Sequence, residues 1–483
     1  MRPVRSLAPL VWVLGASACA VGPNYHAAET PPAEAQPFVS ARPAIASTAE
    51  APPADWWRLY DDPTLDQLVQ EALTNNEDLK AAAANLLRAS GVLSQARAGL
   101  FPTTQLSAND LWGKTGSSDL VAALTGTKAE PSWLGAGAFN VSYEVDLFGR
   151  IRRSIEAARA DASATAEAEN VVRITVAAET ARAYADACAF AAQADTARKS
   201  AELSQQVLDL TRRMRDLGAR SDFDVASAAA TLDQARAAIP TFEGEHRAQL
   251  FELAVLTGHP PAEISQAAAA CQAPPTIRTP LPVGDGAALI KRRPDVREAE
   301  RTLAADTARI GVATADFYPT VSLTGNAASS GTSLKQIASA GNFTYQFGPL
   351  ITWTFPNILV ARAEVIQAKA QASASIASFN SVVLNALKET EQGLSTYDAE
   401  LARHTALAAN VADNESAFDL AQIQLRQGSI SFPDLLQTER NLVAARAELA
   451  ASDQALIDDQ VAVFQDLGGG WEDAPVVVPH KAP

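Results

Sequence analysis

Two long stretches of the chain have the residue pattern of uninterrupted helices. Residues 151–217 contain neither proline nor glycine, and residues 358–427 contain only Gly393 as an interruption. At a rise of 1.5 Å per residue, about 67 residues form a rod of ~100 Å, far longer than a globular domain. Many positions are alanine, which lets neighbouring helices approach closely, as coiled-coil packing requires. The pattern therefore predicts two long rods in one chain.

Each predicted rod ends at a glycine and is followed by the start signal of another helix. Gly218 and Gly428 occupy the place where a left-handed residue commonly ends a helix. Ser221 and Asp224 after the first glycine have a spacing like that of a capping box, in which a serine and an acidic residue three positions later cap a helix start. The second glycine is followed by the same pair of residue types at the same spacing. We therefore expect each rod to turn tightly into a returning helix.

Before each rod, hydrophobic and polar residues alternate with a period of two. Residues 140–147 place Val141, Tyr143 and Val145 on one face and polar side chains on the other, and residues 343–347 alternate in the same way. This pattern predicts strands between an apolar medium and an aqueous one. Sandwich strands of a soluble domain show the same alternation, so the pattern alone leaves both possibilities open.

The chain also repeats itself. Residues 101–109 return as residues 318–326, and residues 73–79 align with residues 290–296 at the same offset. Each half has the order helix, strand pair, very long helix, tight turn, helix, which indicates an internal duplication.

The number of strands restricts how such a chain could cross a membrane. No stretch beyond the N-terminus reaches the ~18 apolar residues of a membrane-spanning helix, so a crossing would have to use strands. Two strand pairs give four strands, and a membrane barrel needs at least about eight strands with no free edge. Several chains must then share one barrel, and three chains would supply twelve strands.

Composition and motifs exclude several functional classes. The chain has 483 residues, a net charge of −16 and no long block of basic residues, which argues against a nucleic-acid partner. The five histidines are widely spaced, and no HExxH, CxxC, GxxxxGK[ST] or GxSxG motif is present. We therefore expect no enzyme, no metal site and no cofactor.

The N-terminus has the features of a secretory signal. A positively charged start, an apolar stretch at 7–14 and small residues at 15–18 precede Cys19. A cysteine in this place resembles a bacterial lipobox, whose thiol is diacylated and becomes the first mature residue. Ala16 stands where lipoboxes usually carry leucine. Ordinary cleavage near Ala18 with an incidental cysteine is the alternative.

These observations define an expected domain organisation. It comprises a signal peptide (1–18), a lipidated N-terminal arm (19–60), a first structural repeat (61–265, with strand pair 101–147 and long helices 151–258), a linker between the repeats (266–283), a second structural repeat (284–470, with strand pair 317–355 and long helices 358–468) and a C-terminal tail (471–483).

Four motifs in this order resemble one family. They are CAVGPNY at 19–25, DWW-x3-DDP-x-L at 55–65, SYEVDLFGR at 142–150 and RPDVREAE at 293–300. Together they are similar to the TolC-type outer-membrane efflux factors, specifically the NodT/OprM-like lipoprotein branch that serves resistance-nodulation-division multidrug pumps.

The resemblance implies an α+β membrane protein that forms a homotrimer. Four strands per chain would build a 12-stranded β-barrel in the outer membrane, continuing into a long periplasmic α-helical barrel with a mixed equatorial domain. It also implies a lipid-anchored, passive exit duct for small molecules, with a periplasmic adaptor and an inner-membrane resistance-nodulation-division transporter as partners. The alternatives are the duct of a type I protein secretion system and a structural lipoprotein that conducts nothing.

The resemblance also assigns roles to the predicted turns. The turns where the family meets its adaptor correspond to Leu217, Gly218, Ala219, Gln427, Gly428 and Ser429. The periplasmic aperture corresponds to Asp224, Asp434, Gln437 and Arg440. Gln437 departs from the family, which has an acid at this position, so we expect Asp434 to act in its place and Arg440 to pair with a neighbouring helix. The two aspartates have the alternative role of simple helix caps.

The remaining cysteines form a candidate disulfide. Cys188 and Cys271 are an even pair once Cys19 is acylated, and the periplasm is oxidising. Cys188 lies about midway along the first rod, and Cys271 lies in the connection between the repeats. We expect a bridge between them, with two buried free thiols as the alternative.

Overall fold

The structure is a computed structural model that describes residues 20–27, 35–114, 116–277, 279–354 and 358–480. The expected signal peptide and Cys19 lie outside the described residues. Within them, none of the helices is both long and apolar enough to span a membrane.

The described chain is mostly helical. Its helices are η2 (Trp56–Tyr60), α2 (Pro63–Asn75), α3 (Glu77–Ala98), α4 (Gly116–Thr125), α5 (Arg150–Asp216), α6 (Asp222–Leu256), α7 (Gln266–Ala269), α8 (Gly286–Arg292), α9 (Pro294–Ala315), α10 (Leu334–Ile337), η3 (Ala340–Asn342), α11 (Ile358–Arg426) and α12 (Phe432–Asp466). Its strands are β1 (Ala46–Ser47), β2 (Thr103–Gly113), β3 (Ser132–Val145), β4 (Leu281–Pro282), β5 (Thr320–Gly331) and β6 (Phe343–Thr352). The two predicted rods correspond to α5 and α11, which match the predicted ranges to within a residue at each end.

The chain packs as two compact units that each draw on both sequence repeats. Of the described residues, the first unit comprises those within 20–27, 87–164 and 300–378, and it holds the four long strands. The second comprises residues 28–86, 165–299 and 379–483, and it holds the helical turns and most of the buried core. The repeat therefore describes the order of elements along the chain, whereas each packed unit combines elements of both halves.

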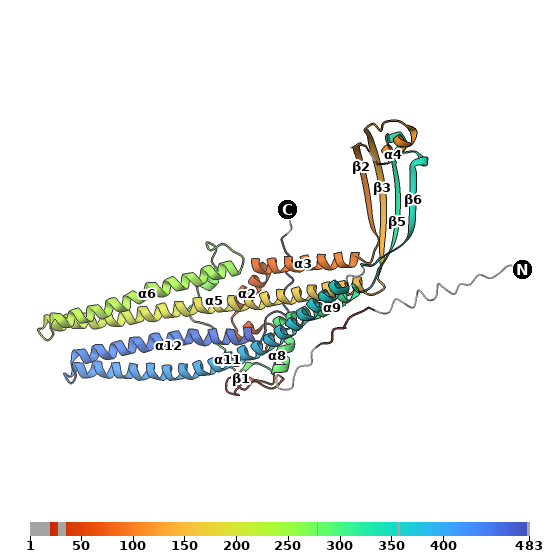
Figure 1. The fold of residues 1–483 in the computed structure, drawn as a ribbon. Coiled ribbons are helices and arrows are strands. Elements are labelled where there is room, and N and C mark those ends of the chain that lie inside the picture. The colour runs from red at the N-terminus through yellow and green to blue at the C-terminus, as the bar shows by residue number, and fades with distance from the viewer. Residues whose placement is uncertain (1–19, 28–34, 115, 278, 355–357, 481–483) are drawn as a thin grey trace. The chain divides into compact units, whose positions relative to one another are not determined.

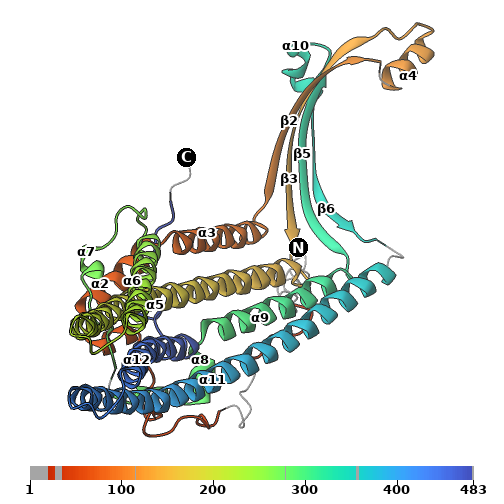
Figure 2. The ribbon, with the colours of Figure 1, turned by 90° about the vertical axis from the view of Figure 1, so that its left-hand side faces the viewer.

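The first unit contains one antiparallel four-stranded sheet in the order β2-β3-β5-β6 (Figures 1 and 2). The central pairing of β3 with β5 joins the strand pair of the first repeat to that of the second. Helices α4 and α10 lie at the end of the sheet where the strand pairs turn. The described part of the chain therefore contains the four long strands expected from the sequence.

The register sorts the side chains of the sheet into two chemically different faces. Because successive strand residues point to opposite sides, paired positions share a face. One face carries Leu106, Trp112, Trp133, Phe139, Val141, Tyr143, Val321, Leu323, Phe343, Tyr345, Phe347 and Ile351. The opposite face carries mainly serine, threonine, asparagine and glutamine. The predicted two-faced strands are thus present in one sheet.

The helix expected before the first strand pair is two helices, α2 and α3, in the structure. Residue Asn76, 3% exposed, separates α2 from α3. Its side-chain oxygen accepts the backbone N–H groups of Asp78 and Leu79, at 2.9 and 3.1 Å, and its amide nitrogen donates to the carbonyl oxygen of Leu256 at 3.1 Å. One asparagine therefore caps α3 and ties its start to the end of α6, a tertiary contact that periodicity does not reveal.

The core of the second unit is built around Trp56, which is fully buried and stacks on Phe464 of α12 with ring centroids 4.9 Å apart. Just beyond η2, Asp62 caps α2 through Thr64 and accepts a hydrogen bond from the hydroxyl of Tyr184 on α5. Further upstream, Glu391 of α11 accepts the backbone N–H groups of residues 39 and 40. The segment ahead of α2 is therefore a packed part of this unit.

A disulfide links α5 to the connection between the repeats. The structure joins Cys188, which is fully buried in α5, to Cys271, which follows α7, with their Cα atoms 5.1 Å apart. Closing this 83-residue separation restricts the unfolded chain, an effect that typically stabilises a protein by ~2–4 kcal/mol.

We expect exported Cys19→Ser protein, denatured without reductant, to show no free thiols, because Cys188 and Cys271 are bridged. Counting maleimide adducts by mass spectrometry measures this, and the same sample after reduction serves as the control and should carry two labels. Two labels before reduction would show that both cysteines are free.

Candidate functional site: the two helical turns

Both rods end in the same backbone arrangement. At the first turn Gly218 has φ +75°, and the N–H groups of Gly218 and Ala219 donate to the carbonyls of Arg215 and Met214, each at 2.8 Å. At the second turn Gly428 has φ +74°, and the N–H groups of Gly428 and Ser429 donate to the carbonyls of Leu425 and Gln424, at 3.1 and 2.9 Å. This is a Schellman motif, in which a left-handed residue lets the last carbonyls of a helix find partners. The turn residues predicted from the sequence therefore lie at the tips of the two helical hairpins.

Each returning helix is capped by the predicted serine and aspartate. The carboxylate of Asp224 accepts hydrogen bonds from the backbone N–H of Ser221 at 3.0 Å and from its hydroxyl at 3.1 Å. Asp434 accepts the same two bonds from Ser431, at 2.9 and 2.5 Å. The hydrogen bonds from Ser431 lower the pKa of Asp434, because they favour the ionised form. Both aspartates thus act as helix caps in the folded chain.

The two tips present different surfaces although their backbones match. At the first tip the side chains of Leu217 and Phe223 are 84% and 76% exposed. At the second tip Phe432 is fully buried, and the guanidinium of Arg220 from the first tip lies over its ring at 5.2 Å. The sequence analysis did not identify Phe223 and Arg220. The matching turn motifs do not reveal that Phe223 is exposed whereas Phe432 is buried beneath Arg220.

The other two predicted aperture residues lie one to two turns into α12. Arg440 donates a hydrogen bond from Nη2 to the hydroxyl of Thr231 on α6 at 3.2 Å, and so contacts a neighbouring helix of the same chain. Gln437 donates to the side chain of Asn441 at 2.9 Å, within α12. The structure therefore brings Arg440 to α6 rather than to Asp434, which is held by its own Ser431.

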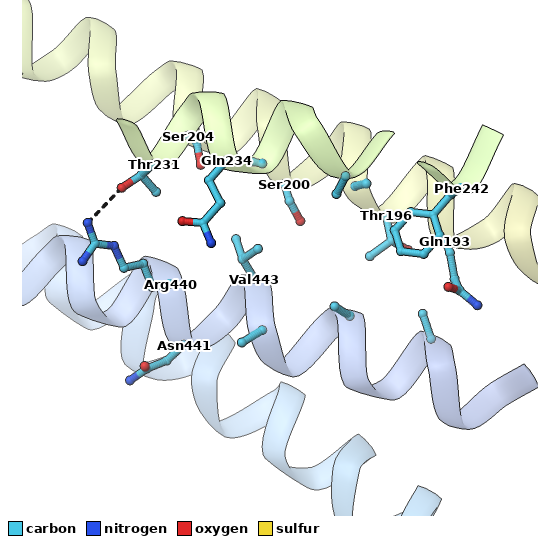
Figure 3. A pocket seen from close by; sticks show the side chains of 16 residues that line it. Gln193, Thr196, Ser200, Ser204, Thr231, Gln234, Phe242, Arg440, Asn441 and Val443 are labelled. Atoms are coloured by element: carbon cyan, nitrogen blue, oxygen red, sulfur yellow. Dashed lines mark hydrogen bonds between the residues drawn. The ribbon is translucent and has the colours of Figure 1, made fainter. Parts of the chain in front are cut away.

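Arg440 stands at one end of a groove of about 490 Å³ lined by α5, α6 and α12 (Figure 3). Small residues and hydroxyls dominate its walls, and Phe242 and Gln193 lie toward the other end. Beside it, the carboxyl of Glu439 is fully buried and accepts a hydrogen bond from the hydroxyl of Ser204 on α5. Burial raises the pKa of Glu439, against the lowering effects of Ser204 and of the charge of Arg440.

The bend from β3 into α5 is the site of the SYEVDLFGR motif. The two carboxylate oxygens of Asp146 accept the backbone N–H groups of Ile151 and Arg152, each at 3.0 Å, and so satisfy the start of α5. Arg150 pairs with Glu144 at 2.6 Å. Gly149 has φ +82°, and an added Cβ would lie 2.6 Å from the Cβ of Ala20. The motif therefore consists of a helix cap and a tight turn, and its residues have structural roles.

Among the parts of the chain that the structure covers, no group of three or more His, Cys, Asp or Glu side chains could hold a metal ion. The polar groups at the turns are instead engaged in caps and in contacts between helices. What the site presents is an arrangement of two capped turns with unequal surfaces.

Comparisons with known proteins agree on one family. A profile of the outer membrane efflux protein family matches residues 68–259 and 287–469. The antibiotic efflux pump outer membrane protein ArpC of Pseudomonas putida is 30% identical, over 97% of this chain and 96% of its own. Nodulation protein T of Rhizobium leguminosarum bv. viciae is 28% identical, over 99% of this chain and 96% of its own. The solved structure of the outer-membrane channel OprN is 32% identical with a TM-score of 0.85, covering 94% of this chain and 100% of that chain.

Proposed function

The chain belongs to the outer membrane efflux protein family, and from this membership we propose that it is the outer-membrane exit duct of a tripartite efflux pump. The duct conducts small molecules such as drugs and toxic compounds passively to the exterior. The family is one of efflux channels rather than of enzymes.

The two-faced sheet is the observation that carries this proposal. An apolar face suits contact with lipid hydrocarbon, and a face of hydroxyls and carboxamides suits a water-filled lumen. Strands β3 and β6 each continue along the chain into one of the two rods, α5 and α11. A single chain thus supplies both strands for a membrane and helices long enough to extend beyond it.

The edges of the sheet support a barrel that several copies of the chain share. Strands β2 and β6 are the two edge strands, 11 and 10 residues long, and unpaired backbone groups in hydrocarbon are costly. Pairing β2 of one copy with β6 of the next removes every edge, and three copies give a 12-stranded barrel. The rods and their returning helices from three copies then form the periplasmic α-helical barrel, and the packed core around Trp56 forms the equatorial domain.

The tips support a periplasmic partner. Leu217 and Phe223 expose apolar side chains on a capped, well-defined turn, as a docking surface for another protein would. We assign this surface to the adaptor, which connects the duct to an inner-membrane resistance-nodulation-division transporter that supplies the energy. The second tip, with Gln427, Gly428 and Ser429, contributes a polar edge to the same surface.

We expect the purified protein to conduct ions in a planar bilayer, and deletion of its gene to raise the susceptibility of the cell to toxic compounds. Both follow if the polar face of the sheet lines a continuous lumen. Heat-denatured protein is the control for the bilayer experiment. Folded trimers that never conduct would instead favour a lipoprotein that spaces the membrane from another structure.

We expect Cys19→Ser to abolish incorporation of radiolabelled fatty acid and to leave an unprocessed precursor, because the proposed lipid anchor is carried by that thiol. Trimers should still form, since strand closure does not require the anchor. The Cys188→Ser/Cys271→Ser variant is the control and should keep its label. Retention of label in the Cys19→Ser protein would contradict lipidation.

We propose that the turns close the periplasmic end at rest. Three copies bring Asp434 into a ring of like charge near the axis, and Arg440 holds α12 against α6. We expect Asp434→Ala/Arg440→Ala to raise single-channel conductance and vancomycin sensitivity while trimers remain, because the charged ring and the contact between helices are both lost.

The exposed pair Arg198 and Glu243 joins α5 to α6 away from both turns and offers a matched control, since replacing both with alanine also removes one acid and one base. That variant should conduct as the wild type does. Unchanged conductance in folded Asp434→Ala/Arg440→Ala trimers would contradict the aperture assignment.

A further inference from the structure

One row of side chains crosses the whole sheet with the same functional group at every strand. Gln105 is paired in register with Asn140, Asn140 with Asn326, and Asn326 with Gln346. Paired residues point to the same side of a sheet, and this is its polar face. The Nδ2 atom of Asn326 donates a hydrogen bond to Oδ1 of Asn140 at 2.6 Å, which places the two central carboxamides in direct contact.

The rows on either side are made of smaller side chains. The flanking row toward the turns of the strand pairs is Ser107, Ala138, Ala328 and Thr344. The flanking row toward the rods is Thr103, Ser142, Thr324 and Gly348. The carboxamide row therefore projects farther from the sheet than either of its neighbours.

The same face is almost free of charge. Across the described strands β2, β3, β5 and β6, Glu144 is the one acidic or basic residue on the polar face, and it is paired with Arg150. A carboxamide offers two N–H donors and an acceptor oxygen without a net charge. The single hydrogen bond between Asn326 and Asn140 leaves donors and acceptors in the row that can bind water or a passing solute.

We propose that the row Gln105, Asn140, Asn326 and Gln346, here called the carboxamide row, forms the narrowest section of the strand-lined lumen. It contacts the cargo through uncharged hydrogen bonds. This inference rests on the proposed trimeric duct, in which three such rows face one lumen. The cargo that we propose for this duct is small molecules with neutral hydrogen-bonding groups. The uncharged carboxamides can replace some of the water molecules that hydrate such groups.

A cysteine reporter on each side of the carboxamide row tests how wide the lumen is at the row. Ser107→Cys lies on the side of the strand turns and Ser142→Cys on the side of the rods, and Cys188 and Cys271 are already bridged. Intact cells are treated with a small maleimide and with a polyethylene glycol maleimide. We expect the small reagent to reach both reporters and the large reagent to react readily only at Ser107→Cys.

Changing all four carboxamides to serine should raise the rate of the large reagent at Ser142→Cys several-fold and leave the small reagent unchanged. Adding Ala138→Asn and Ala328→Asn, which are register partners in the flanking row, should restore the restriction. If the four-serine protein does not form trimers, Gln105→Ser/Gln346→Ser preserves the central hydrogen bond and should give a smaller increase. No change in the labelling ratio in folded trimers would overturn the proposal.

Aspartate substitutions test whether the uncharged row controls which ions pass through the lumen. Asn140→Asp/Asn326→Asp should shift the reversal potential in a salt gradient toward cation selectivity, and more strongly than Ser142→Asp/Thr324→Asp, which adds the same charge to the wider flanking row. Equal shifts would show that the carboxamide row is not the narrowest section.

Different results would contradict the proposed duct and the proposed role of the carboxamide row. If the wild type does not conduct and the small reagent reaches neither reporter, the duct itself is wrong. If the wild type conducts but the labelling ratio and selectivity are insensitive to the row, only the row assignment is wrong. A purely structural role for the carboxamides would lower the thermal stability of the trimer without moving either readout.

Discussion

The pairing of β3 with β5 is the contact on which the rest of the sheet depends. Each repeat by itself supplies one strand pair, and an isolated pair is marginally stable at best. The eleven register pairs from Gly135 with Gly331 to Val145 with Val321 unite the two pairs into one sheet. Because side chains alternate with a period of two, a slip of one residue here would move one half of the apolar surface to the aqueous side. The hydrogen bond between Asn140 and Asn326 crosses this same seam.

The two halves have turns with the same backbone conformation, as expected for a duplication, but the side chains exposed at those turns differ. Both turns have a glycine with positive φ followed by a serine and aspartate cap. At the first turn the aromatic side chain Phe223 is exposed, whereas Phe432 at the second is buried beneath Arg220. The same backbone turn can therefore occur in both halves for a structural reason while the side chains that the two tips expose differ.

Sequence patterns predicted the elements that depend on local chemistry. The rods, their glycine ends and the alternating strands follow from helix stops, caps and periodicity, and the structure places them within a few residues of the expected ranges. The break at Asn76 was not predictable, because its cause is a contact with Leu256, 180 residues away. The burial of Phe432 was missed for the same reason, and the expected contact of Arg440 with a neighbouring helix could not be assigned to Thr231 from the sequence. They arise from packing between segments that local pattern does not bring together.

The contacts around the turns differ in the free energy that is needed to break them. Asp434 is bound to Ser431 of its own turn, so α12 can move with its cap intact. Arg440 is joined to α6 by a hydrogen bond to a neutral hydroxyl, a contact whose net contribution is typically about 0.5–1.5 kcal/mol on folding. Glu439, one residue earlier, is fully buried against Ser204 of α5, and a buried carboxyl left without its partner is costly. The contact of α12 with α5 at Glu439 is therefore costlier to break than the hydrogen bond of Arg440 to α6.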